Sequence, residues 1–104
     1  MLCLGLMSGT SADGVDAVLA RFQGAPDRPE WQLLSHHHSP YPAALRDELV
    51  RIGQGEARPA AALLDLAEAV TEHQALAARG ADPDQRASLI GCHGQTLWHR
   101  PPSS

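Results

Sequence analysis

The chain has 104 residues, of which 43% are hydrophobic and 19% are charged. This length suits one small domain, and the hydrophobic fraction is too high for a disordered polar tail. The 12 acidic and 8 basic residues give a net charge of −4, which does not favour nucleic acids or anionic membranes as partners. The sequence contains no Lys, which excludes a Walker A loop, because that loop uses a lysine to reach the nucleotide phosphates.

The N-terminal segment lacks the features of an export signal, and no apolar run approaches the ~20 residues of a membrane-spanning helix. We therefore expect a cytoplasmic protein that does not bind membranes. Cys3 and Cys92 lie in apolar segments without the spacing of metal ligands, which predicts two buried, reduced thiols and not a disulfide. The sequence does not indicate an oligomeric state.

Three strands are predicted in the first 40 residues. Residues 2–7 form a nearly continuous apolar run, typical of a strand that is buried on both faces. After an Asp-Gly turn signal, residues 15–22 resume a strand-like pattern, so that the first two strands form a hairpin. A third strand is expected over residues 31–38, between a turn-rich break and two prolines.

Two helices and a fourth strand are predicted to follow. Apolar residues at helical spacing indicate a short helix over residues 45–52 and a longer one from Pro59 through Ala78, closed by Arg79 and Gly80. Residues 87–92 form another apolar run that ends at a polar motif. The element order strand, strand, strand, helix, helix, strand predicts an α/β fold with a crossover back to a parallel strand.

The loop between the first two strands combines small residues, hydroxyl groups and two carboxylates. Gly9 and Gly14 allow the backbone to approach a ligand, and successive amides in such a loop can bind an anion. Asp13 and Asp16 would repel bare phosphates, so they fit best near Mg²⁺ or its water ligands. The alternative is an ordinary hairpin, since the same residue types are common in turns.

A second polar motif, His93-Gly94-Gln95-Thr96, follows the fourth strand, and open α/β sheets bind ligands at the carboxyl ends of their strands. His93, Gln95 and Thr96 offer donors and acceptors that suit sugar hydroxyl or N-acetyl groups. A turn stabilised by its own side chains is the alternative. We favour ligand contact, because three adjacent hydrogen-bonding side chains exceed what a turn requires.

Together, the two motifs resemble the early signatures of the anhydro-N-acetylmuramic acid kinase family. They are Met-Ser-Gly-Thr-Ser-Ala-Asp-Gly-Val-Asp at residues 7–16 and the stretch at residues 90–101, in which His-Gly-Gln-Thr follows the fourth strand. The sequence departs from the family pattern at Ala12, where Leu is commoner, and at Cys92, where a small residue such as Ser is expected. We expect both changes to be tolerated.

The resemblance implies the actin, Hsp70 and sugar-kinase fold, in which two RNase H-like lobes hold ATP and substrate in a cleft. It implies ATP-dependent phosphorylation of 1,6-anhydro-N-acetylmuramic acid, with opening of the anhydro bridge by water to give N-acetylmuramate 6-phosphate in peptidoglycan recycling. The implied cofactors are ATP and Mg²⁺, and Asp13 and Asp16 are the implied Mg²⁺ contacts, directly or through water. The implied substrate contacts are His93, Gln95 and Thr96. The implied ATP-binding residues are Gly9, Thr10, Ser11, Ala12, Asp13, Gly14, Val15 and Asp16.

The resemblance also implies that residues 1–104 are only the N-terminal part of the first ATP-binding lobe. Chains of this family are considerably longer, and their catalytic aspartate lies beyond the residue that matches position 104. No catalytic residue is therefore assigned here, and the second lobe is absent. The remainder of the kinase chain would be the partner, and the isolated chain is expected to be inactive.

Two other classes of function stay open at this point. A stand-alone RNase H-like nuclease would use Asp13 and Asp16, but it would need more acids than one hairpin supplies. A non-catalytic metal-binding module would be built on the six His residues. Among these, His36 and His38 share one face of the third strand, where a solvated strand end is the simpler interpretation. Trp31 is predicted to pack.

Overall fold

The computed structural model describes residues 1–9, 11–25, 27–95 and 97. These residues form an α/β fold in which every element expected from the sequence is present, in the expected order. The elements are β1 (Leu2–Ser8), β2 (Gly14–Ala25), β3 (Arg28–Pro40), α1 (Ala43–Gly53), α2 (Ala60–Ala81) and β4 (Leu89–Gln95).

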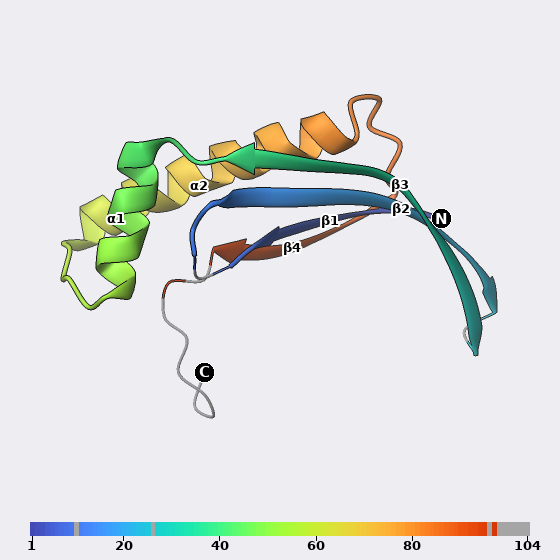
Figure 1. Cartoon of the computed structure of the whole chain (residues 1–104), viewed down its shortest axis with the longest axis horizontal. Coiled ribbons are helices and arrows are strands. Elements are labelled where there is room, and N and C mark those ends of the chain that lie inside the picture. The colour runs from blue at the N-terminus through green and yellow to red at the C-terminus, as the bar shows by residue number, and fades with distance from the viewer. Residues whose placement is uncertain (10, 26, 96, 98–104) are drawn as a thin grey trace.

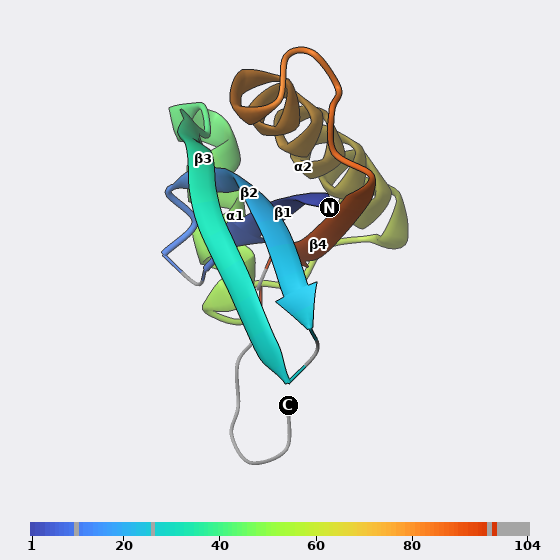
Figure 2. The ribbon, with the colours of Figure 1, turned by 90° about the vertical axis from the view of Figure 1, so that its right-hand side faces the viewer.

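The four strands form one mixed sheet in the order β3-β2-β1-β4 (Figure 1). β1, β2 and β3 pair antiparallel as consecutive hairpins, whereas β4 lies parallel to β1. A parallel neighbour needs a crossover, and the segment that contains α1 and α2 supplies it. β2 and β3 continue beyond β1 as a long hairpin arm (Figure 2).

The hydrophobic core lies between the helices and one face of the sheet. Alternate side chains of β1 and β2 are buried, because successive residues of a strand point to opposite faces. The core residues of the strands and helices are Leu4, Leu6, Val15, Ala17, Leu19, Leu49, Leu66, Val70, Ala77 and Ala81. Met7, which lies on the opposite face, is 63% exposed. Neither helix in the described part of the chain has the length and the apolar composition of a membrane span.

Local predictions differ from the structure at several points. β1 is not buried on both faces, because Gly5 and Met7 on the face away from the core are exposed. α2 does not end at Gly80 but continues to Ala81, and a Cβ at Gly80 would overlap the ring of His37. Gly80 therefore permits a close approach between α2 and β3. Trp31 is not packed but is 68% exposed, because it lies in the hairpin arm opposite Phe22. Cys3 and Cys92 are both free thiols, as predicted, but neither is buried: Cys3 is partly exposed and Cys92 is exposed.

Candidate functional site

The loop between β1 and β2 turns sharply at Ala12. The Ala12 backbone N–H donates to the Gly9 carbonyl at 3.1 Å, and the Ala12 φ is +53°. The side chain of Ala12 is buried, whereas Ser11 and Asp13 are exposed. Thr10 lies outside the described residues. The turn therefore presents the polar side chains on either side of Ala12 to solvent, where a ligand can reach them.

The two glycines of this loop have different surroundings. A Cβ at Gly14 would overlap the backbone of Ser39 and Pro40, so Gly14 is required by the close approach of β3. A Cβ at Gly9 would meet no described atom within 4 Å. Packing therefore explains Gly14 but not Gly9, which leaves Gly9 as the glycine that suits close approach of a ligand.

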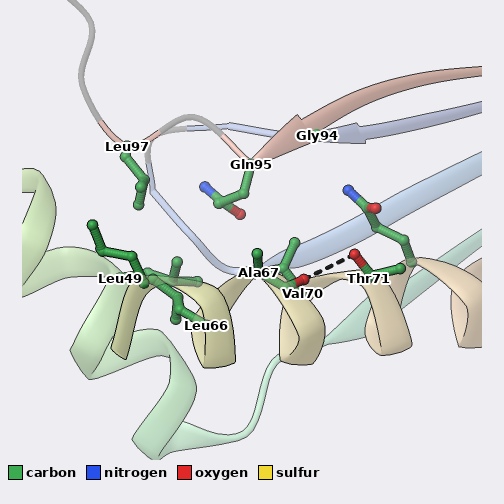
Figure 3. A pocket seen from close by; sticks show the side chains of 10 residues that line it. Leu49, Leu66, Ala67, Val70, Thr71, Gly94, Gln95 and Leu97 are labelled. Carbon is green, nitrogen blue, oxygen red and sulfur yellow. Dashed lines mark hydrogen bonds between the residues drawn. The ribbon is translucent and has the colours of Figure 1, made fainter. Parts of the chain in front are cut away.

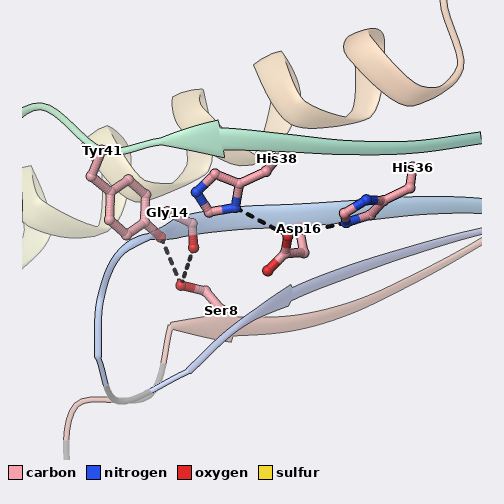
Figure 4. Close-up of polar contacts among 6 residues, drawn as sticks. All are labelled: Ser8, Gly14, Asp16, His36, His38 and Tyr41. Carbon is pink, nitrogen blue, oxygen red and sulfur yellow. Dashed lines mark hydrogen bonds and ion pairs between the residues drawn. The ribbon is translucent and has the colours of Figure 1, made fainter.

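A polar network beneath the loop joins β1 to β4; Figure 4 shows the part of it formed by Ser8, Gly14 and Tyr41. The Ser8 hydroxyl donates to the Gly14 carbonyl at 2.7 Å and also contacts Gln95 Oε1. The Tyr41 hydroxyl donates to Gln95 Oε1 at 2.9 Å and lies 3.3 Å from Ser8 Oγ. Gln95 Nε2 donates to the Gly9 carbonyl at 2.8 Å. Burial raises the pKa of Tyr41 above its usual 10.0, so this hydroxyl remains a donor at neutral pH.

Asp13 forms an ion pair with Arg46 of α1, in which Arg46 Nε lies 3.4 Å from Asp13 Oδ1. Both side chains are about half exposed or more, so the pair contributes less than ~1 kcal/mol to stability. The pair nevertheless places the positive charge of Arg46 beside the loop. Sequence reasoning missed Arg46, since only the packing of α1 brings it to this position.

Asp16 is held by two histidines of β3 (Figure 4). Asp16 Oδ1 lies 3.2 Å from His36 Nε2 and 3.0 Å from His38 Nδ1. The hydrogen bond with His38 is the main cause that lowers the pKa of Asp16 below its usual 3.8. The strand pattern correctly placed His36 and His38 on one face. It did not identify Asp16 as their partner, because that pairing depends on the register between β2 and β3.

The structure thus connects the two predicted Mg²⁺ contacts to different elements, Asp13 to α1 and Asp16 to β3. Within the described ranges, no group of three or more His, Cys, Asp or Glu side chains is arranged to hold a metal ion by itself. A cation at this loop would therefore need ligands from elsewhere, such as phosphate oxygens or water.

The second motif contains a bulge at Gly94 that separates its polar side chains. Leu6 pairs with Cys92, but Ser8 pairs with Gln95, so β4 has one extra residue here. Gly94 supplies the left-handed φ of +78°. The extra residue places Gln95 on the core side of the sheet together with Ser8, whereas His93 stays on the opposite face.

His93 and Gln95 consequently line different cavities. His93 lines one of about 350 Å³ on the open face of the sheet, together with Met7 and Asp16. Gln95 lines another of about 350 Å³ between β4 and α2 (Figure 3). Thr96 lies outside the described residues. The structure therefore does not bring His93 and Gln95 to one site, although only Gly94 separates them in the sequence.

Comparison with known proteins gives one consistent result. Residues 1–104 match the family described as "Anhydro-N-acetylmuramic acid kinase". A protein of that name from Synechococcus sp. strain CC9605 is 67% identical over 103 residues, which are 99% of this chain and 27% of the relative. The relative from Synechococcus sp. strain CC9902 is 65% identical over 104 residues, covering 100% and 27% of the two chains. The relative from Prochlorococcus marinus strain NATL1A is 52% identical over 100 residues, covering 96% and 26%. The chain spans about a quarter of the length of these curated relatives.

Proposed function

The chain belongs to the anhydro-N-acetylmuramic acid kinase family, and on this premise we propose that residues 1–104 form the N-terminal part of the first ATP-binding lobe of such a kinase. The lobe would have the RNase H-like fold of actin, Hsp70 and sugar kinases. The β1–β2–β3 meander, followed by a helical crossover to a strand parallel to β1, supports this assignment. The remainder of the kinase, with the second lobe and the catalytic aspartate, would be the partner of this segment.

The proposed reaction is ATP-dependent phosphorylation of 1,6-anhydro-N-acetylmuramic acid. Water opens the anhydro bridge, and the product is N-acetylmuramate 6-phosphate, an intermediate of peptidoglycan recycling in the cytoplasm. The observation that carries this proposal is the family match over the whole chain, which includes both signature motifs. The same match does not favour a stand-alone nuclease or a metal-binding module.

The loop of residues 9–16 would hold the phosphates of ATP. The absence of packing around a Cβ at Gly9, the exposure of Ser11 and Asp13, and the nearby Arg46 charge support this role. Arginine is well suited to bind phosphate oxygens. The other members of the set, Ala12, Gly14 and Val15, are buried and would shape the loop from beneath. Thr10 keeps its assignment from the resemblance alone.

Mg²⁺ would bind together with ATP, and its charge would neutralise the phosphate oxygens. Carboxylate oxygens are ligands that fit this hard cation. Asp13 is the better candidate, since its side chain is 63% exposed beside the loop. Asp16 already bonds to His36 and His38, so a contact with the ion or its water ligands would be made in addition to these two hydrogen bonds.

The β4 motif would contact the anhydro sugar. His93 is exposed and lines a cavity on the open sheet face, which supports a direct contact. Gln95 already bonds to Ser8, Tyr41 and Gly9, so a contact with the sugar would be an addition to that role. Thr96 remains a candidate through the resemblance.

A full-length chimera tests the proposed function. Residues 1–104 replace the matching quarter of the Synechococcus sp. strain CC9605 relative, and the purified chimera is incubated with ATP, Mg²⁺ and the anhydro sugar. Mass spectrometry should detect N-acetylmuramate 6-phosphate, and residues 1–104 alone should give none. A cooperatively folded chimera without this product would contradict the kinase proposal. Product from the isolated chain would contradict the account of this segment as one part of a lobe.

A further inference from the structure

Tyr41 belongs to neither signature motif, yet it occupies the centre of the network beneath the loop. It lies between the end of β3 and the start of α1 and is only 6% exposed. Its ring packs edge-on against His73 of α2, with the ring centroids 5.6 Å apart and an interplanar angle of 76°. The ring is thus fixed by the core, while its hydroxyl points toward Ser8 (Figure 4).

Tyr41 acts on both ends of the turn that spans Gly9 to Asp13. At one end, its backbone N–H donates to the Asp13 carbonyl at 3.2 Å. At the other end, its hydroxyl donates to Gln95 Oε1 at 2.9 Å, and the Gln95 amide in turn donates to the Gly9 carbonyl at 2.8 Å. Groups from outside the hairpin therefore hold both ends of the turn in place.

The orientation of Gln95 is central to this arrangement. Its Nε2 must face Gly9, because a carbonyl can only accept, and its Oε1 must then face the hydroxyl groups of Ser8 and Tyr41. Ser8 has a single proton, which it also shares with the Gly14 carbonyl. The Tyr41 hydroxyl is therefore the donor that keeps Gln95 Oε1 satisfied whenever Ser8 bonds to Gly14.

We propose that Tyr41 is a positioning residue for the nucleotide, which holds the phosphate-binding loop against the end of β4 through Ser8 and Gln95. The inference rests on the proposed kinase function. Tyr41 itself touches no substrate. A displaced loop would bind the phosphates less well. It would also slow phosphate transfer, because small errors in the placement of binding groups strongly reduce transfer rates.

The test is Tyr41→Phe in the chimera, since this change removes only the hydroxyl and keeps the ring against His73. The KM for ATP should rise about fivefold, the usual effect of one lost hydrogen bond, while the KM for the anhydro sugar stays unchanged. Ser8→Ala should act in the same direction. The double variant should show less than the product of the two effects, because the two hydroxyl groups serve one network.

Leu19→Val is the matched control. It removes one methylene from a core residue that is 1% exposed and belongs to none of these hydrogen bonds. It should lower the Tm without changing either KM, which separates positioning from a general loss of stability. An unchanged KM for ATP in a folded Tyr41→Phe chimera would overturn the proposal, and so would an equal rise in both KM values.

Calorimetric titration with ATP and Mg²⁺ separates this inference from the proposed function. If the unsubstituted chimera binds ATP but forms no product, the kinase proposal fails, and weaker binding of ATP by Tyr41→Phe still supports positioning. If the unsubstituted chimera does not bind ATP, both proposals fail. Equal affinity of the two proteins for ATP would overturn the positioning role alone.

Discussion

The two glycines of the β1–β2 loop should respond to the same substitution in opposite ways. At Gly14, an added methyl group would overlap the backbone of Ser39 and Pro40. Backbone atoms of a paired strand cannot rotate away as a side chain can, so Gly14→Ala would force β2 and β3 apart. We expect a loss of about 3 kcal/mol, typical of overpacking at a rigid site.

At Gly9, the added methyl group would meet no described atom within 4 Å. Gly9→Ala should therefore change the free energy of unfolding by less than about 0.5 kcal/mol. Its methyl group would instead stand where the phosphates approach. We expect the KM for ATP to rise by about tenfold or more, because the phosphates could no longer take up their position against the backbone.

Thermal scanning and steady-state kinetics of the two chimera variants separate these effects. Gly14→Ala should lower the Tm of the transition that involves this segment by about 5 °C or more, and Gly9→Ala should leave it in place. A Gly14→Ala variant as stable as the parent would refute the close approach of β3. Normal kinetics of Gly9→Ala would refute the assignment of this loop to phosphate binding.

Three further predictions concern the polar side chains of the site. Asp13→Asn should raise the KM for ATP and leave that for the sugar unchanged in assays that vary each substrate; equal effects on both would contradict its place beside the phosphates. The pKa of Asp16 is lowered below 3.8, chiefly by His38, so this carboxylate stabilises the fold above pH ~3.8 and loses that effect as the pH falls through its lowered value. NMR titration should find this low pKa. Asp16→Asn should remove the part of the pH dependence of stability that this carboxylate causes. Gln95→Ala should reduce turnover and also cost about 1–3 kcal/mol of stability, because it removes the hydrogen bonds of Gln95 to the buried Ser8 and Tyr41 hydroxyl groups and to the Gly9 carbonyl. Reduced turnover at full stability would favour contact with the sugar alone.

Much of the fold could be predicted because it depends on local patterns. The apolar run at residues 2–7 and the helical spacing after Pro59 each indicate one element, and the structure has both. The element bounds were less accurate, as at α2, which continues through Gly80. A glycine after a helical run usually ends the helix, but here it makes room for His37.

The candidate site was predicted only in part, because its partners come from distant segments. The hairpin loop and the β4 motif were recognisable as polar strings that follow apolar runs. Arg46 and Tyr41 were not, since a single arginine or tyrosine near a helix start carries no local signal. They reach the loop because the pairing of β2 with β3, which sets Gly14 opposite Pro40, brings the start of α1 beside it.

The sequence by itself determined the order of strands and helices, the position of the loop and the resemblance to one kinase family, because hydrophobic periodicity and motif strings are properties of neighbouring residues. Tertiary structure alone decided which side chains meet. The register of β2 against β3 pairs Asp16 with His38, and the bulge at Gly94 sends Gln95 and His93 to opposite faces of the sheet. A shift of one residue reverses the face of every side chain that follows it, and nothing within a strand's own sequence reveals where its partner strand sets that shift.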